Sequence, residues 1–398
     1  MSSSSSYLVI GAGVMGLSVA RAILNKKPSA SIVVVEKERQ EAMHASGRNS
    51  GVLHAGFYYT ADSLKAKFTK DGNAAWTKFC DERDLPINKC GKVVVAKNES
   101  ELEGIETLYA RGIKNSVDVK IIDEIELADI EPNAKTYQKA LYSPTTSTVD
   151  PALLCAKLRG ELEKAGVEFI FGDGYAAKIE DGVRLKSAKT LKGVKIINCA
   201  GLYADNIAKD FGFGGDYTII PFKGIYLKYS NSDAPIKTNI YPVPNLKNPF
   251  LGVHYTITVD SVIKIGPTAI PAFWRENYSG LDNFKFLEFV DIVSSEARLF
   301  LKNAFGFRSL ALTEMQKYNK EYLASLAAEL VKVVDNDGFR EWSKPGIRAQ
   351  LLNTDTLELL QDFVVEGDEQ SIHILNAVSP AFTAALPFGE WVVKNYLE

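Results

Sequence analysis

The sequence has little of what several classes of protein require. Its four cysteines match no metal-binding spacing, so we interpret them as reduced thiols (Cys80, Cys90, Cys155 and Cys199). No apolar run is long enough to span a bilayer, and the opening Met1–Ser6 lacks the basic and apolar stretches of a signal peptide. A net charge of −3 argues against nucleic-acid binding. We therefore expect a cytoplasmic protein, and peripheral attachment to a membrane stays open.

The first segment of the chain has the pattern of a nucleotide-binding unit. A short apolar strand, Tyr7–Ile10, runs into Gly11-Ala12-Gly13-Val14-Met15-Gly16 and a helical pattern, and a second strand, Ser31–Val35, is followed by Glu36. In this fingerprint the glycines allow a tight turn, a close approach of the backbone to a pyrophosphate, and close helix packing. The acid accepts hydrogen bonds from ribose hydroxyls. The pattern predicts dinucleotide binding but does not distinguish FAD from NAD.

A loop rich in glycine and polar residues follows this unit. Between Met43 and Tyr59 it carries hydrogen-bond donors and then a histidine among small and aromatic residues (Ser46, Arg48, Asn49, Ser50 and His54). Arginine suits a phosphate, and Gly47 and Gly51 permit close backbone approach. We interpret the loop as following an extended dinucleotide from phosphate to redox ring. The alternative is a polar surface loop with a satisfied histidine.

Small residues mark two further places where a ligand could lie. Asn198-Cys199-Ala200-Gly201 ends a strong strand, and Ala377–Thr383 precedes the last helix. In open α/β sheets, ligands bind at the carboxyl ends of strands. We expect Cys199 to be a buried packing residue and not a nucleophile.

The composition changes from Tyr217 onward. Successive strands separated by proline and glycine turns predict an antiparallel sheet in a second domain (219–229, 239–243, 251–258 and 262–266). The region carries Lys223, Tyr226, Tyr241 and His254, which would suit a small anionic substrate, although ordinary strand residues are the alternative. Residues 284–334 are predicted to be mostly helical.

With these residues considered together, the sequence resembles the FAD-dependent oxidoreductases of the D-amino-acid-oxidase superfamily. Within it the resemblance is strongest to the L-2-hydroxyglutarate dehydrogenase family. It covers nearly the whole chain and rests on several motifs (Arg48–Gly56, Tyr58-Tyr59, Ser63–Lys67, Pro221–Gly224, Tyr241–Pro244, Phe250–His254, Gly266-Pro267, Gly346–Gln350 and Asn376–Ala381). Two departures are Lys223, where arginine is expected, and the weakly recognisable segment 284–334.

The resemblance implies FAD as cofactor and an α/β fold. A Rossmann-like FAD-binding domain of the glutathione-reductase type is joined to an antiparallel-sheet substrate domain, as in D-amino-acid oxidase. We expect the FAD domain to comprise 1–75, 145–215 and 336–398, and the substrate domain 76–144 and 216–335. The implied reaction is oxidation of an L-2-hydroxy acid, most closely L-2-hydroxyglutarate, to the 2-keto acid by hydride transfer to flavin N5.

Two other functions stay open from the sequence. One is an amino-acid or amine oxidase that uses oxygen, and the other is a flavin-binding module without turnover. The electron acceptor could be a quinone, a dye-like carrier or oxygen. The sequence does not indicate the oligomeric state.

The interpretation assigns a role to each candidate site residue. The base is His54 in preference to His254, because an imidazole titrates near neutral pH. The substrate anion is expected to meet Tyr58, Lys223, Tyr241 and Arg348. FAD is expected to contact the glycine fingerprint, the loop and the small-residue segments (Gly11, Gly13, Val14, Met15, Gly16, Glu36, Lys37, Ser46, Arg48, Asn49, Ser50, Gly51, Cys199, Ala200, Gly201, Gly346, Pro380, Ala381 and Phe382). No metal is expected.

Overall fold

The computed structural model describes residues 6–231, 236–244, 252–333 and 335–397. Most of the predicted N-terminal serine tail lies outside these residues, as do Phe250 and Leu251 of the motif that ends at His254.

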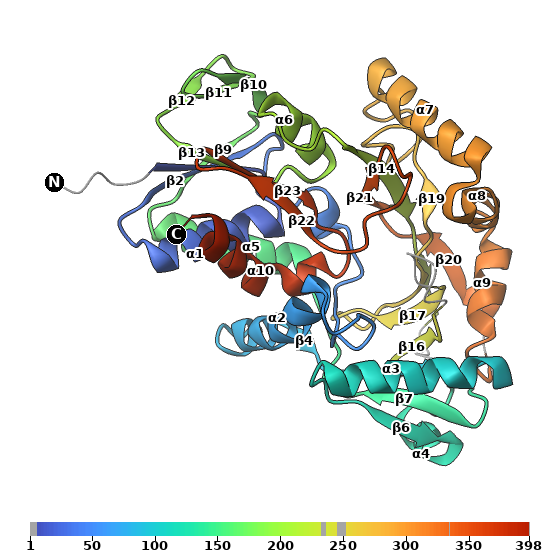
Figure 1. The fold of residues 1–398 in the computed structure, drawn as a ribbon. Coiled ribbons are helices and arrows are strands. Elements are labelled where there is room, and N and C mark those ends of the chain that lie inside the picture. Colours follow the sequence, from blue (N-terminus) through green and yellow to red (C-terminus); the bar gives the residue numbers. More distant parts are fainter. Residues whose placement is uncertain (1–5, 232–235, 245–251, 334, 398) are drawn as a thin grey trace.

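A six-stranded sheet forms one side of the molecule (Figure 1). Its order is β22-β23-β13-β1-β2-β9, and every neighbouring pair is parallel except β22 with β23. The strands are β1 (Ser6–Ile10), β2 (Ser31–Glu36), β9 (Glu168–Phe171), β13 (Lys195–Asn198), β22 (Val364–Gly367) and β23 (Ser371–Asn376). The predicted glycine turn joins β1 to helix α1 (Val14–Lys26).

Both faces of this sheet are covered. One face packs against α1 and three further helices, α2 (Leu64–Asp81), α5 (Pro151–Lys164) and α10 (Ala381–Tyr396). The other packs against α6 (Ala204–Asp210) and a small sheet of β10 (Tyr175–Ile179), β11 (Gly182–Leu185) and β12 (Thr190–Lys192). Side chains alternate along a strand, so Val9 and Leu8 enter the two opposite cores. A sheet buried on both faces explains the unbroken apolar strands of the sequence.

An eight-stranded sheet forms the other side of the molecule. Its order is β20-β15-β18-β17-β16-β5-β7-β6. The strands are β5 (Lys92–Val95), β6 (Lys120–Asp123), β7 (Lys139–Ser143), β15 (Leu227–Tyr229), β16 (Asn239–Pro242), β17 (His254–Ile257), β18 (Ile263–Gly266) and β20 (Phe339–Trp342). It is antiparallel, as predicted, except that β16 runs parallel to β5. Helices α3 (Leu102–Lys114), α4 (Glu124–Ile130) and α9 (Lys320–Ala328) pack on it.

A three-stranded sheet stands between these two. It consists of β14 (Tyr217–Gly224), β19 (Ile270–Pro271) and β21 (Gly346–Asn353), and helices α7 (Phe286–Lys302) and α8 (Phe307–Gln316) pack against it. The single strand predicted over 219–229 is therefore wrong. The chain leaves this sheet after Gly224 and enters the eight-stranded sheet at Leu227. The apolar pattern runs through the break, so the sequence does not reveal it.

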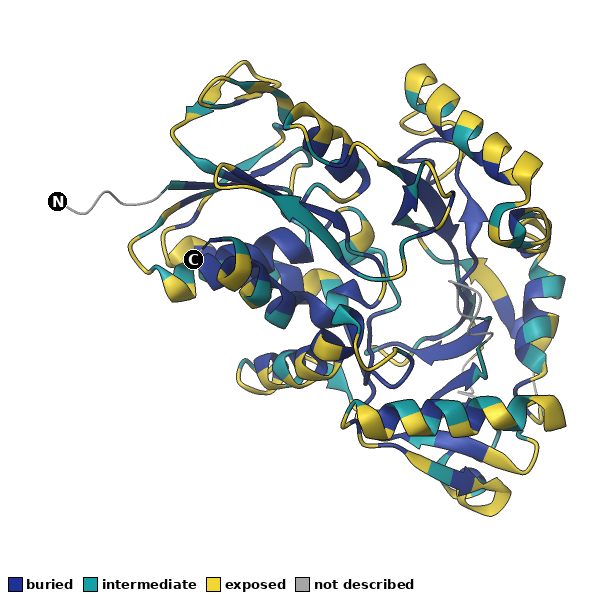
Figure 2. Cartoon of the chain, viewed as in Figure 1, coloured by how far each residue is buried: buried dark blue, intermediate teal, exposed yellow. Residues whose placement is uncertain are grey.

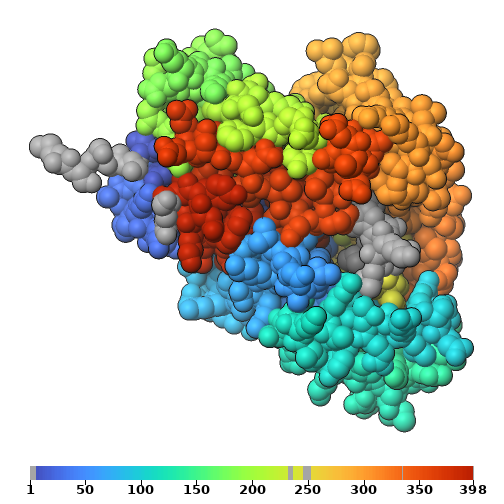
Figure 3. All heavy atoms as spheres, viewed as in Figure 1, coloured from blue at the N-terminus to red at the C-terminus, as the bar shows by residue number. Residues whose placement is uncertain are grey.

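The predicted combination of a Rossmann-like sheet with a mainly antiparallel one is confirmed. The first and last parts of the chain meet through α1 and α10, so blue and red surfaces are adjacent in Figure 3. The exact domain boundaries stay a prediction. β20, which begins after the predicted boundary at residue 336, pairs with β15 of the eight-stranded sheet. A short sheet of β3 (Val52–Leu53), β8 (Ser147–Val149) and β4 (Ile87–Asn88) leads out of the polar loop.

Candidate active site

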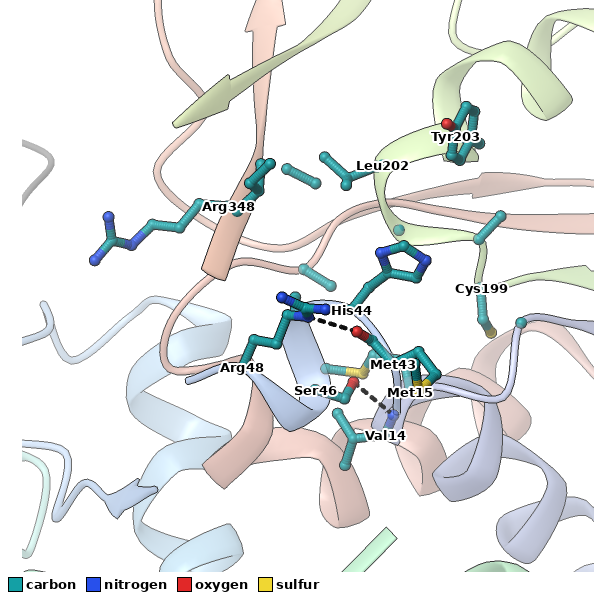
Figure 4. A pocket seen from close by; sticks show the side chains of 18 of the residues that line it. Val14, Met15, Met43, His44, Ser46, Arg48, Cys199, Leu202, Tyr203 and Arg348 are labelled. Atoms are coloured by element: carbon teal, nitrogen blue, oxygen red, sulfur yellow. Dashed lines mark hydrogen bonds between the residues drawn. The ribbon is translucent and has the colours of Figure 1, made fainter. Parts of the chain in front are cut away.

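A cavity of about 830 Å³ begins at the carboxyl ends of β1, β2 and β13. It extends past the polar loop and the start of α10 to His54, Tyr226 and Arg348. Figure 4 shows part of it, with side chains from separate segments of the chain around one space. The position agrees with the rule that ligands of open α/β sheets lie beyond the strand carboxyl ends.

The glycine fingerprint opens the N-terminus of α1 to this cavity. A Cβ atom on Gly16 would lie 1.9 Å from the carbonyl oxygen of Gly11, so the third glycine is required for α1 to pack against the turn. A Cβ on Gly13 would lie 3.0 Å from Oγ of Ser46, which accepts a hydrogen bond from the backbone N–H of Val14 at 2.9 Å (Figure 4). Gly11, Gly13, Val14 and Met15 line the cavity, and Gly16 lies behind them. A helix N-terminus favours a phosphate.

Glu36 lies at the end of β2 and lines the cavity. Its carboxylate accepts hydrogen bonds from the backbone N–H groups of Ala12, at 2.8 Å, and Glu38, at 3.0 Å. These bonds fix the carboxylate beside the glycine turn, where the fingerprint expects the ribose of a nucleotide.

Lys37 takes part in a polar network at the same end of the cavity. Its ammonium is paired with Glu38, lies 2.7 Å from a carboxylate oxygen of Glu276 and 2.8 Å from Nε2 of His44. Nδ1 of His44 lies 2.7 Å from the hydroxyl of Tyr278. The two acids and the imidazole are close enough to share a cation, and the ammonium of Lys37 lies among them. The network therefore links β2 to the segment after β19.

The polar loop is held by its own side chains. Nε of Arg48 donates to the carbonyl of Met43 at 2.7 Å (Figure 4), and its guanidinium lies 4.3 Å from the ring centre of Tyr278. These contacts position the loop, and they do not support the phosphate contact expected of Arg48. Arg48 lines the cavity with its neighbours Ser46, Asn49 and Ser50, whereas Gly51 does not. A Cβ on Gly51, at φ +79°, would lie 2.3 Å from the carbonyl oxygen of Val149.

The remaining residues predicted to contact FAD border the same cavity. All seven line the cavity (Cys199, Ala200, Gly201, Gly346, Pro380, Ala381 and Phe382). Burial raises the pKa of Cys199, which agrees with a packing role and not with a nucleophile.

His54 lies at the far end of the cavity from the Lys37 network. It directly follows β3, and its backbone N–H donates to Oγ1 of Thr383 on α10 at 3.1 Å. The side chain is buried but lines the cavity. Burial lowers the pKa of His54 well below its ordinary value, with a further contribution from Lys92, so the imidazole is neutral at physiological pH.

Three residues of the eight-stranded sheet lie behind His54. Nζ of Lys92, on β5, is 3.3 Å from Nδ1 of His54 and 4.1 Å from the ring centre of Tyr241 on β16. The ring of Tyr241 is stacked on that of His254, with centres 3.6 Å apart. Tyr58 also lies over the ammonium of Lys92, at 5.3 Å. Tyr58, Tyr241 and His254 are not among the described residues that line the cavity, so they form the support of the site and not its wall.

The structure separates the two candidate bases. Nδ1 of His254 lies 2.8 Å from the carbonyl oxygen of Gly252, and burial lowers the pKa of His254 to about 3. His54 borders the cavity and His254 does not. This arrangement favours His54 as the group that meets a substrate.

The sequence interpretation missed Lys92. The sequence signal for it is a lysine at the first position of an otherwise apolar strand, Lys92-Val93-Val94-Val95, in which all four residues are buried. An isolated charge in such a strand is uncommon without a partner or a function. The partner, His54, comes from a segment 38 residues earlier and could not be read from the strand.

The two candidate substrate cations lie on opposite faces of one sheet. In the antiparallel pair of β14 and β21, Phe222 is opposite Arg348 and Lys223 is opposite Ile347. Directly opposed residues share a face and successive residues alternate, so Lys223 and Arg348 point to different sides. Arg348 lines the cavity, while Nζ of Lys223 is buried 3.4 Å from Oδ1 of Asn277. The position of Lys223 does not support the substrate contact predicted for it.

Comparison with known proteins agrees with this geometry. A family model described as FAD dependent oxidoreductase, DAO, matches residues 6–395. The chain belongs to this family. Its cofactor is FAD, and the cavity fits such a ligand: its volume lies near the upper end of the range for small-molecule sites, and it joins a helix N-terminus to a buried imidazole.

Curated relatives of this chain include proteins named L-2-hydroxyglutarate dehydrogenase. The chain is 34% identical over 420 residues to "L-2-hydroxyglutarate dehydrogenase, mitochondrial" of Nematostella vectensis, covering 98% of this chain and 90% of that protein. It is 34% identical over 396 residues to "L-2-hydroxyglutarate dehydrogenase" of Escherichia coli (strain K12), covering 98% and 92%. Among solved structures, the FAD-bound L-alpha-glycerophosphate oxidase of Mycoplasma pneumoniae superposes with a TM-score of 0.75 at 21% identity, covering 98% of this chain and 94% of that one. The glycine oxidase of Geobacillus kaustophilus gives 0.71 at 16% identity, covering 98% and 94%.

Proposed function

We propose that this protein oxidises L-2-hydroxyglutarate to the corresponding 2-keto acid. The named relatives, at about one-third identity over nearly the whole chain, support this substrate. The observation that carries the proposal is the placement of a neutral imidazole, His54, and a guanidinium, Arg348, on one FAD-sized cavity. Anaerobic reduction of the bound flavin by this acid is the experiment that tests it.

The residues divide the chemistry between them. Bound FAD supplies N5 as the acceptor of the hydride from C2. His54 takes the proton of the substrate hydroxyl, because its neutral ring keeps a lone pair on one nitrogen. Arg348 binds the carboxylate with its planar pair of N–H donors. Removing the proton while the hydride leaves avoids the accumulation of positive charge on the substrate.

The guanidinium of Arg348 is held in place for this task. It donates to the carbonyl oxygen of Thr268 at 3.0 Å, and Tyr226 and Glu314 contribute favourably to its charge. Burial nevertheless lowers the pKa of Arg348, so the cation sits in a poorly solvated position. A carboxylate that enters the cavity would replace the missing solvent, which supports Arg348 as the substrate anchor.

We propose that the reduced enzyme delivers its electrons to an acceptor at a membrane surface. None of the helices in the described part of the chain is long and apolar enough to cross a membrane. The outer surface of α7 and α8 is exposed, as the yellow parts of these helices in Figure 2 show, and several of its exposed side chains are large and apolar. Leu287, Val290 and Leu301 recur on one side of α7 at helical spacing and are 76%, 45% and 73% exposed.

The charges around this apolar surface suit anionic headgroups. Arg298, Lys302 and Arg308 are exposed there, whereas of the acids on these helices Asp291 is exposed, Glu288 is half-buried, and Glu296 and Glu314 are buried. An amphipathic helix with basic flanks binds at the interface of a bilayer through apolar burial and attraction to anionic lipid. A membrane quinone would then be within reach as the acceptor.

Replacing Leu287 and Leu301 together by serine is expected to release the protein from vesicles that contain phosphatidylglycerol. Burying a leucine side chain stabilises membrane binding by ~1.5–3 kcal/mol, so we expect the affinity of the double variant for vesicles to fall by at least about tenfold. Cosedimentation measures it. Ile125→Ser on α4 is the matched control, because Ile125 is also 76% exposed. Failure of the unaltered protein to sediment with vesicles, or equal sedimentation of the double variant, would contradict a membrane-bound acceptor.

A further inference from the structure

Lys92 is a buried lysine with unusual surroundings. None of its surface is exposed, and no carboxylate pairs with it among residues 6–231, 236–244, 252–333 and 335–397. Its ammonium meets Nδ1 of His54 at 3.3 Å and the faces of Tyr241 and Tyr58. An ammonium in such a place is costly unless paired, so burial lowers the pKa of Lys92 to about 7.

The contact with Nδ1 couples the proton of Lys92 to the tautomer of His54. A neutral imidazole has one N–H donor and one acceptor nitrogen. A charged Lys92 donates to Nδ1, which places the histidine proton on Nε2 and removes the lone pair needed to accept a substrate proton. A neutral Lys92 accepts from Nδ1–H and leaves the lone pair on Nε2. Only the second state is a base toward the cavity.

We propose that Lys92 is the positioning residue of His54, selecting its basic tautomer and taking up the proton that passes through it. This inference rests on the proposed function, in which His54 receives the hydroxyl proton. The O–H bond of the substrate breaks as Nε2–H forms, and Nδ1–H breaks as a third N–H bond forms on Lys92. The C2 hydrogen leaves with its electron pair to the flavin. Charge is conserved, because the proton ends on Lys92 as an ammonium.

This route avoids a buried imidazolium. Burial disfavours the charged form of His54, so an isolated His54 would be a weak base. In the relay the ring is neutral before and after, and the positive charge forms over the aromatic faces of Tyr241 and Tyr58, which stabilise a cation.

The other ionisable groups around Lys92 do not titrate near neutral pH. Burial raises the pKa of Tyr58 and Tyr241 well above their ordinary values, and it also raises the pKa of Cys90, before β5. Burial lowers the pKa of His254 to about 3. Among these groups Lys92 is the one whose protonation changes around pH 7, so its state should govern the reaction there.

Stopped-flow reduction of the FAD-loaded enzyme by L-2-hydroxyglutarate, between about pH 5.5 and 9, tests the relay. For the unaltered enzyme the rate should rise through pH 7 and then level, because the neutral amine is required. Lys92→Met should lose this rising limb of the pH profile near pH 7, and its rate of flavin reduction should be lower by roughly 10- to 100-fold. Lys92→Arg should be slower still, since a guanidinium stays charged and holds His54 in the wrong tautomer. A role of Lys92 in charge or packing alone predicts the opposite order.

Lys65→Met is the matched control. Lys65 is also buried, with its pKa lowered by burial to about 8, but it lies on α2 outside the described cavity lining. The variant should keep the limb near pH 7. Retention of that limb in Lys92→Met, or an unaltered rate in Lys92→Arg, would overturn the inference.

A second readout does not depend on turnover. The chain has only four histidines, so ¹⁵N-histidine labelling yields few signals to assign. In the FAD-loaded protein His54 should change from the Nε2–H to the Nδ1–H tautomer as pH rises through about 7. If the acid fails to reduce the flavin but this change is seen, the proposed substrate is wrong and the coupling stands. If the flavin is reduced and the tautomer does not change, the relay is wrong. This measurement also decides the matter if the Lys92 variants fail to fold.

Discussion

Replacing His54 by alanine is expected to slow reduction of the bound flavin by about 10²–10⁴-fold, the usual contribution of a general base. The reason is that, of the two candidate bases His54 and His254, His54 borders the cavity, and its neutral ring can accept the hydroxyl proton. FAD should stay bound, because the phosphate and ribose contacts lie at the other end of the cavity. Rapid mixing without oxygen measures the rate, and the flavin absorbance measures occupancy.

Two companion variants make this test specific. His54→Asn should be nearly as slow as alanine, since the amide can hold a hydrogen bond but cannot take the proton. His254→Ala should affect the rate much less, because His254 lies behind Tyr241 and outside the described cavity lining. If His254→Ala abolishes reduction and His54→Ala changes affinity alone, the two roles are exchanged.

Replacing Arg348 by alanine is expected to lower kcat/KM for L-2-hydroxyglutarate by at least about 30-fold, equivalent to ~2 kcal/mol for the lost charge-assisted hydrogen bonds. Most of the change should appear in KM, because the guanidinium binds the carboxylate in the ground state as well as in the transition state. Arg348→Lys should recover only part of the loss, since an ammonium lacks the planar fork.

Lys223→Ala is the natural comparison for Arg348→Ala. The two residues lie on neighbouring positions of paired strands but face opposite sides of the sheet. Steady-state kinetics should therefore show a small effect of Lys223→Ala beside a large effect of Arg348→Ala. The reverse ranking would mean that the substrate lies on the other face of β14, next to Asn277.

The sequence predicts those parts of the site whose residues lie close together along the chain. The glycine fingerprint and Glu36 are separated by one strand and one helix, so their spacing predicts both the turn and the ligand. The same holds for Cys199–Gly201 and Pro380–Phe382, since small residues at element ends mark a place where a ligand approaches. These segments line the cavity because the parallel order of β1, β2, β13 and β23 brings their carboxyl ends to one edge.

What the sequence could not predict depends on pairing between distant segments. The roles of Lys223 and Arg348 differ through the register of β14 against β21, which no local pattern reveals. The coupling of Lys92 to His54 arises because β5 joins the eight-stranded sheet with its first side chain turned toward the segment after β3. The contact of Arg48 with Tyr278 is of the same kind. In each case the residue type indicated a role, but the sequence did not identify the residue that it contacts.

One measurement tests the central claim most directly: anaerobic mixing of the FAD-loaded protein with a panel of 2-hydroxy and 2-amino acids. We predict that L-2-hydroxyglutarate bleaches the yellow flavin absorbance, that its D-enantiomer and L-glutamate do not, and that a dye then restores the colour. Bleaching by an amino acid, followed by peroxide release in air, would instead indicate an amino-acid oxidase. A flavin that no acid of the panel bleaches would contradict the proposed activity and leave a protein that binds FAD without turning over a hydroxy acid.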